Sequence, residues 1–210
     1  MERRYTPQRT TVESRADGGK EIRGYAAVHY NPNDTGTEYR LYDDMVERIM
    51  PGAFDRAIED QHDVRALFNH DSSMVLGRSE SGTLKLASDA TGLRYVVDPP
   101  NTQIGRDVVE LLSRGDVSGS SFAFLPTKVS WEDRMDSDTR KVTYIRKIED
   151  VELLDVGPVT YPAYDSTTAG VRSAEDAKDA IAGLREYQSR QRDVEVRLRQ
   201  IKLDSDRFLQ

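Results

Sequence analysis

The sequence predicts a mainly β protein of the α+β class: a small β-barrel or sandwich with flanking helices, followed by a long C-terminal amphipathic helix. Short β-rich runs separated by turn residues recur between residues 21 and 156. Two segments among them carry apolar residues at helical spacing. Residues 174–205 carry apolar residues at three- and four-residue steps in a strongly charged background, which is typical of an amphipathic helix.

The N-terminal part begins without periodicity. Residues 1–20 are polar and end in a turn at Asp17-Gly18-Gly19, so we expect a flexible N-terminal arm. Two sets of side chains alternate with a period of two over residues 21–29, which predicts a half-buried strand. Pro51 suits the first position of a helix of about ten residues, because its φ angle is already helical.

The middle of the chain predicts strands around one well-defined helix. Three runs separated by turn residues are expected to form an antiparallel meander: 64–68, 83–87 and 93–97. The helix at 102–113 has Asn101 or Thr102 as its N-cap and Gly115 just past its end. Four more strands are expected, with a long acidic hairpin loop at 132–139 between the second and the third: 117–124, 128–131, 142–148 and 151–156.

The C-terminal part is expected to lie outside the barrel. Pro158, Pro162 and residues 165–173 interrupt regular structure. We therefore expect a domain at 21–164, a linker at 165–173 and a helical tail at 174–210. One apolar stripe does not decide whether this tail packs on the barrel or on another molecule.

Composition excludes several classes of protein. The 37 acidic and 30 basic residues leave a net charge of −7, which repels phosphate backbones and argues against a nucleic-acid partner. The chain has no cysteine, which excludes disulfides, thiolate metal sites and a cysteine nucleophile. No apolar stretch is long enough for a membrane span or a signal peptide, so we expect a cytosolic protein without a membrane partner.

Serine and histidine are the main candidates for covalent catalysis in a chain without cysteine. Of the three histidines, His29 ends a predicted strand before a polar loop and His62 lies in a polar connection, and both are expected at the solvated surface. His70 follows the apolar run Ala66-Leu67-Phe68 and precedes Asp71-Ser72-Ser73. It is expected at a strand rim, where an imidazole is held in place but stays reachable.

A nucleophile and an acid could come from two further strands. Gly119-Ser120-Ser121 places serines in an otherwise apolar strand, as an active site would, although a glycine-rich edge strand would look similar. Alternation gives Asp150 and Glu152 a solvated face. Asp155 alternates in step with Val151 and Leu153, so it is the acid expected to point into the protein. Asp150 and Glu152 remain rivals for the acidic member of the site.

These residues belong to a longer series of motifs that resembles the prohead (capsid maturation) proteases of Hong Kong 97-like tailed phages. The resemblance extends over residues 20–164. It is carried in order by Gly24-Tyr25-Ala26, Pro51-Gly52-Ala53-Phe54, Leu67-Phe68-Asn69-His70-Asp71 with Leu76-Gly77, Gly92-Leu93, Gly115 to Phe124, and Val151 to Ala163.

The resemblance implies a serine endopeptidase with the small β-barrel of herpesvirus assemblin. It places the catalytic histidine at His70 and the nucleophile at Ser121, with Ser120 at a variable position. The acid falls most regularly at Asp155, whereas an alignment on the assemblin strand would favour Asp150. Ala123 stands where the family usually has glycine, and Gly157 where it often has serine.

The resemblance also implies a biological setting. It predicts acyl transfer without a cofactor or metal, with oxyanion donors near Gly119 or the Gly157 loop. The expected substrates are the major capsid protein and the scaffold, inside assembling proheads in the host cytoplasm, beside the portal and shell. Self-cleavage within 165–176 is expected, and a homo-oligomer is one option. The rival readings are a non-catalytic assembly factor that docks through its C-terminal helix, and a hydrolase of small esters.

Overall fold

The computed structural model describes residues 1–6, 8–161 and 174–208, which belong to two compact units, Met1–Val171 and Arg172–Gln210. The strands described are β1 (Glu2–Thr6), β2 (Thr11–Ser14), β3 (Lys20–Val28), β4 (Tyr39–Tyr42), β5 (Met45–Ile49), β6 (Arg65–Leu67), β7 (Val75–Arg78), β8 (Leu84–Ser88), β9 (Gly92–Val97), β10 (Gly119–Met135) and β11 (Val142–Val159). The helices described are η1 (Thr35–Thr37), α1 (Asp55–Glu59), α2 (Gln103–Arg114) and α3 (Ala174–Phe208).

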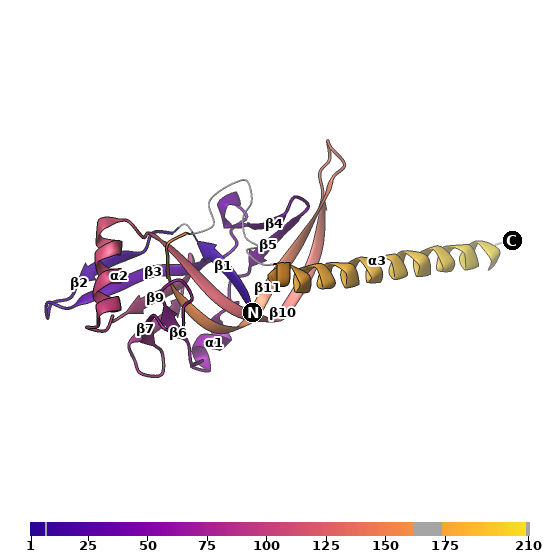
Figure 1. Cartoon of the computed structure of the whole chain (residues 1–210). Coiled ribbons are helices and arrows are strands. Elements are labelled where there is room, and N and C mark those ends of the chain that lie inside the picture. The colour runs from indigo at the N-terminus through magenta and orange to yellow at the C-terminus, as the bar shows by residue number, and fades with distance from the viewer. Residues whose placement is uncertain (7, 162–173, 209–210) are drawn as a thin grey trace. The chain divides into compact units, whose positions relative to one another are not determined.

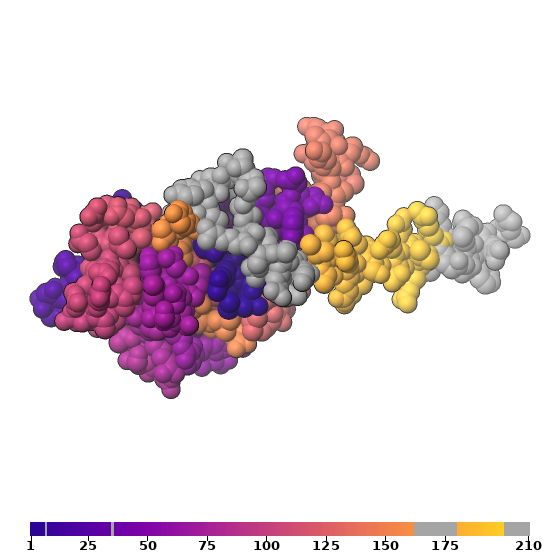
Figure 2. Space-filling view, in the orientation of Figure 1, coloured from indigo at the N-terminus to yellow at the C-terminus, as the bar shows by residue number. Residues whose placement is uncertain are grey.

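The first unit contains two sheets (Figure 1). The larger sheet has the order β1-β10-β11-β5-β4, and β6 and β7 continue it from β11. The smaller sheet has the order β2-β3-β9-β8. Strand β11 is central to the larger sheet, because it pairs antiparallel with β10 and parallel with both β5 and β6. The tip of the β10–β11 hairpin stands out from the other strands (Figures 1 and 2).

The mainly β architecture with helices is confirmed, but the predicted closed barrel is not. In the described part of the chain, the larger sheet ends at β1, β4 and β7 and the smaller one at β2 and β8. Predicted strands at 117–124 and 128–131, and at 142–148 and 151–156, are joined into the long strands β10 and β11. Register shifts around Ala123, Pro126 and Lys128 let β10 bend without ending. The hairpin loop is correspondingly short, because pairing continues to Met135.

Residues 1–20 are not the flexible arm that their polarity predicts. Strand β1 pairs with β10, and β2 pairs with β3. Glu2, Arg4 and Thr6 are buried. The prediction was wrong because Glu2 and Arg4 are not solvated: each forms an ion pair with a side chain from another strand.

Aromatic side chains fill the interior of the first unit. Phe122 and Phe124 point to one face of β10, and their rings stack at 4.9 Å between centroids. Phe54, just before α1, meets Phe122 edge to face at 5.6 Å. Burying a side chain of this size stabilises the fold by about 1.5–3 kcal/mol. Because successive side chains on a strand point to opposite faces, Ser121 and Ala123 lie on the other face of β10.

The helices agree with the sequence to different degrees. Helix α2 begins and ends as predicted: Thr102 accepts a hydrogen bond from the Gly105 amide, and Gly115 is left-handed at φ 82°. Helix α1 has five residues rather than about ten. Strands β4, β5 and β7 were not predicted.

The predicted C-terminal helix is present as α3. It carries exposed apolar side chains at Val194, Val196 and Leu198. The expected linker at 165–173 lies outside the described residues. None of the described helices combines the length and the apolar character needed to cross a bilayer.

Candidate active site

Three polar side chains from distant parts of the chain meet on one face of the larger sheet. His70 Nδ1 lies 2.5 Å from Asp155 Oδ1, and His70 Nε2 lies 2.5 Å from Ser121 Oγ. A carboxylate only accepts hydrogen bonds, so Nδ1 is the donor to Asp155. Nε2 is then free to accept the proton of the Ser121 hydroxyl. The structure therefore brings together the three residues that the sequence singled out, with the imidazole between the serine hydroxyl and the carboxylate, which is the arrangement of a catalytic triad.

The pairing of β10 with β11 places two of these residues. Ser121 is opposite Gly157, and Ala123 is opposite Asp155. Residues opposite each other, and residues two apart, point to the same side of a sheet. Ser121 and Asp155 therefore lie diagonally across the two strands on one face, with room between them for an imidazole.

A strained turn after β6 supplies that imidazole. Asn69 and His70 both adopt left-handed backbone conformations, at φ 55° and φ 59°. Such a conformation costs about 1–2 kcal/mol for a residue other than glycine. The Asn69 side chain accepts from the Thr160 main-chain N–H and donates to the Thr160 hydroxyl, and the Asn69 main-chain N–H donates to the Pro158 carbonyl. These contacts hold the turn against the end of β11.

Gly157 allows β6 to approach β11 closely enough to bring His70 into place. A Cβ atom on this residue would lie 2.0 Å from the Leu67 carbonyl oxygen. Strand β6 pairs with β11 through only two residue pairs, Arg65 with Asp155 and Ala66 with Val156. The glycine at 157, a departure from the serine that the resemblance led us to expect, is thus required by this backbone.

The two rival acids lie away from the histidine. Asp150 accepts hydrogen bonds from Arg56 at 2.7–3.0 Å and from the Thr127 hydroxyl. The Arg56 guanidinium is the main cause that lowers the pKa of Asp150. Glu152 is exposed. Of the three acids, only Asp155 contacts His70.

Ser120 points to the opposite face of β10. Its Oγ lies 2.6 Å from Thr10 Oγ1 and 2.7 Å from the Tyr95 hydroxyl, and those two oxygens are 3.2 Å apart. All three residues are buried, and burial raises the pKa of Tyr95 to about 12. Ser120 is therefore part of a buried hydroxyl cluster and does not contact His70.

The other histidines are not at the solvated surface, as their polar neighbours had suggested. His29 is 4 % exposed, stacks on Phe54 and contacts the Asp89 carbonyl through Nδ1. Burial is the main cause that lowers its pKa. His62 is half-buried. Within the described ranges, no three His, Asp or Glu side chains gather in a group that could hold a metal ion.

Strand β1 contributes contacts to the site that sequence reasoning missed. The Ser121 hydroxyl also lies 2.9 Å from the Arg4 carbonyl oxygen, and the Tyr5 ring meets the His70 ring edge to face at 6.2 Å. Ser121 is fully buried, and the side chains of His70 and Asp155 are 4 % and 10 % exposed. A main-chain carbonyl has no signature in a sequence, so only strand pairing could reveal this contact.

Comparisons with known proteins place the site in a family context. A family model described as caudovirus prohead serine protease matches residues 8–180, which include all three residues of the site. No curated protein and no solved structure matches the chain.

Proposed function

Because the chain belongs to the caudovirus prohead serine proteases, we propose that it cleaves scaffold and major capsid protein during prohead maturation, with Ser121, His70 and Asp155 as its catalytic residues. The observation that supports these roles is the pair of 2.5 Å hydrogen bonds through which His70 joins the other two side chains. The oxyanion donors near Gly119 or Gly157 stay a prediction.

The proposed reaction is acyl transfer to serine and then to water. Ser121 Oγ attacks the scissile carbonyl carbon while His70 Nε2 takes the hydroxyl proton. His70 gives that proton to the leaving amine as the carbon–nitrogen bond breaks. A water molecule then loses its proton to His70 and attacks the acyl-enzyme, and Ser121 recovers its proton. Throughout, the Asp155 carboxylate orients the imidazole and stabilises its charged form.

The C-terminal part has a separate proposed role. We propose that α3 tethers the enzyme inside the shell and that self-cleavage near residues 165–176 releases or inactivates it. Exposed Val194 and Leu198 on α3 support a contact with another protein. A chain that lacks residues 174–210 should still cleave a supplied peptide and should fail to enter proheads. Normal incorporation of this truncated chain would contradict the tether.

Co-expression with the phage's major capsid protein tests the proposed activity. Mass spectrometry should find capsid-protein fragments with the wild-type enzyme and only the intact protein with Ser121→Ala. Fragments produced equally by both enzymes would contradict the role of Ser121. Assembled proheads that hold the wild-type enzyme and only uncut capsid and scaffold proteins would favour the non-catalytic assembly factor.

A further inference from the structure

We propose that β1 occupies the edge of β10 on which a substrate strand binds, so that the first residues of the chain block their own active site until they are displaced. This inference rests on the proposed function, because it assumes that Ser121 is the nucleophile. It adds a regulatory role for the N-terminus and a place for the substrate.

The site as it stands does not admit a substrate. An attacking oxygen must come within about 3–3.5 Å of the carbonyl carbon. Ser121 has no exposed surface, and only 4 % of the His70 side chain is exposed. A polypeptide and a water molecule can reach these atoms only if a neighbouring segment moves.

Strand β1 is a neighbouring segment that contacts both residues. Its Arg4 carbonyl oxygen lies 2.9 Å from Ser121 Oγ, and Tyr5 covers the edge of the His70 ring. Strand β1 runs antiparallel to β10, with Tyr5 opposite Ser121. An extended peptide commonly binds by adding a strand to a sheet edge, where main-chain hydrogen bonds hold it. Strand β1 thus places a main-chain carbonyl oxygen within hydrogen-bond distance of Ser121 Oγ, on the sheet edge that a substrate strand would use.

The position of β1 in the sheet allows it to leave. It is an end strand of the larger sheet, and among the described strands it pairs only with β10. The pairing of β10 with β11 holds Ser121 and Asp155 in place without it. Its departure would leave unpaired main-chain groups along β10 beside Ser121, and such an edge accepts another strand.

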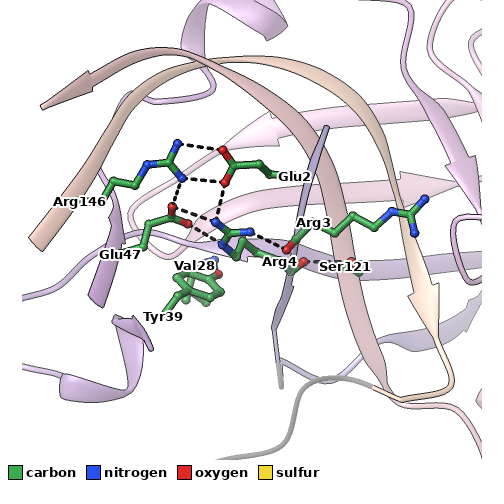
Figure 3. A network of polar contacts seen from close by, with 8 residues as sticks. All are labelled: Glu2, Arg3, Arg4, Val28, Tyr39, Glu47, Ser121 and Arg146. Carbon is green, nitrogen blue, oxygen red and sulfur yellow. Dashed lines mark hydrogen bonds and ion pairs between the residues drawn. The ribbon is translucent and has the colours of Figure 1, made fainter. Parts of the chain in front are cut away.

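A buried ionic network holds β1 down on the face opposite Ser121. Arg4 donates to Glu47 of β5 at 2.6 and 3.0 Å, and Arg146 of β11 donates to Glu2 at 2.7 and 2.8 Å (Figure 3). All four side chains are at most 4 % exposed. The network joins β1 to two other strands of the sheet.

This network separates into two neutral pairs. Glu2 and Arg4 bond each other within β1 at 2.6 Å, while Glu47 and Arg146 bond each other at 2.7 Å. Breaking a buried ion pair is costly mainly because it leaves one charge uncompensated. When β1 leaves with its own pair, the charges left in the protein body remain paired. The network therefore holds β1 in a way that permits its release.

A reversible lock on β1 tests the proposal in the full chain. The chain has no cysteine, and Arg3 is opposite Ala123 in the register. Opposite Cα atoms in an antiparallel pair are about 4.5–5.5 Å apart, which suits a disulfide. In Arg3→Cys/Ala123→Cys, labelling of Ser121 by a fluorophosphonate probe and cleavage of a peptide should both fall by about tenfold or more on oxidation. Reduction should restore both rates.

A second variant tests release in the opposite direction. Glu2→Gln/Arg4→Met removes the charges of β1 and leaves the neutral Glu47–Arg146 pair, so labelling should become faster than in the wild type. The matched control makes the same exchanges at the exposed pair Glu13 and Arg23, whose side chains lie 3.2 Å apart. This control should label at the wild-type rate.

The outcomes separate the two proposals. Equal rates for the oxidised and reduced forms of the locked variant would overturn the blocking strand and leave the protease intact. Failure of the two thiols to form a disulfide would also overturn it, because it would contradict the pairing of β1 with β10. Absence of labelling and cleavage in the wild type, the reduced form and the loosened variant alike would refute the proposed function itself.

Discussion

Two neighbouring serines should respond to the same substitution in opposite ways. Ser120→Ala and Ser121→Ala each delete one buried hydroxyl from β10. The Ser121 hydroxyl lies between two acceptors, His70 Nε2 and the Arg4 carbonyl. The Ser120 hydroxyl joins Thr10 and Tyr95 on the other face. We therefore expect the loss of Ser121 to affect activity and the loss of Ser120 to affect packing.

The magnitudes follow from the protons available to each hydroxyl. The Ser121 hydroxyl has one proton and so donates to only one of its two acceptors at any moment. Ser121→Ala therefore removes the equivalent of one hydrogen bond and lowers the free energy of unfolding by about 1 kcal/mol. The same substitution should lower kcat by about a millionfold, by analogy with other serine proteases. Ser120 belongs to a cluster of three hydroxyls, and its loss removes two bonds, about 2 kcal/mol. That loss lowers Tm by about 4–8 °C in a domain of this size.

Peptide cleavage and thermal unfolding of both purified variants check these values. We expect Ser121→Ala to be inactive with a Tm close to that of the wild type, and Ser120→Ala to be less stable and to retain most activity. An inactive but stable Ser120→Ala would show that the faces of β10 are reversed. Comparable activity in both variants would refute the catalytic role of Ser121.

Three further predictions concern the acid, the strand contact and the ionic network. Asp155→Asn should lower kcat about 10⁴-fold by analogy with other triads, while Asp150→Asn should retain activity in the same peptide assay. Gly157→Ala should push β6 and His70 outward and lower kcat/KM about 100-fold, whereas Gly82→Ala, which meets no atom within 4 Å, should lower only Tm. Burial alone would raise the pKa of Glu2, but Arg146 and Arg4 outweigh burial and lower it. The stability that Glu2 contributes is therefore present above pH 4.5 and lost as pH falls through its lowered pKa, so urea midpoints of wild type and Glu2→Gln should converge as the pH is lowered through that range.

The parts of the molecule that were predictable from sequence are those governed by local rules. Helix α2 follows from its Thr102 cap and Gly115 stop, because both act within a few residues. Parity selected Asp155 as the buried acid and Glu152 as the exposed one, but the alternation breaks here: a register shift pairs Leu153 with Phe124 and Asp155 with Ala123, so Asp155 points to the opposite face of the sheet from Leu153. The placement of His70 beside Ser121 came from the motifs of the family, since no local rule relates residues 51 positions apart.

The parts that escaped prediction depend on pairing between distant strands. Strand β1 reads as solvated because Glu2 and Arg4 are charged, and only the folded sheet supplies Glu47 and Arg146 to neutralise them. The two sheets were taken for a closed barrel because alternation along a strand does not specify its neighbours. In the described residues the two sheets instead have end strands at β1, β4, β7, β2 and β8.

Two of the three site residues lie on one hairpin, whereas the third is held by a short contact between distant segments, and this difference sets the order in which the site assembles. Ser121 and Asp155 sit on the two arms of one hairpin, a local element that can form early. His70 depends on the parallel contact of β6 with β11, which comprises two residue pairs and connects segments about 90 positions apart. Such contacts form late and open first on warming. A newly made chain would thus acquire its general base last, and activity should disappear on heating before the hairpin unfolds.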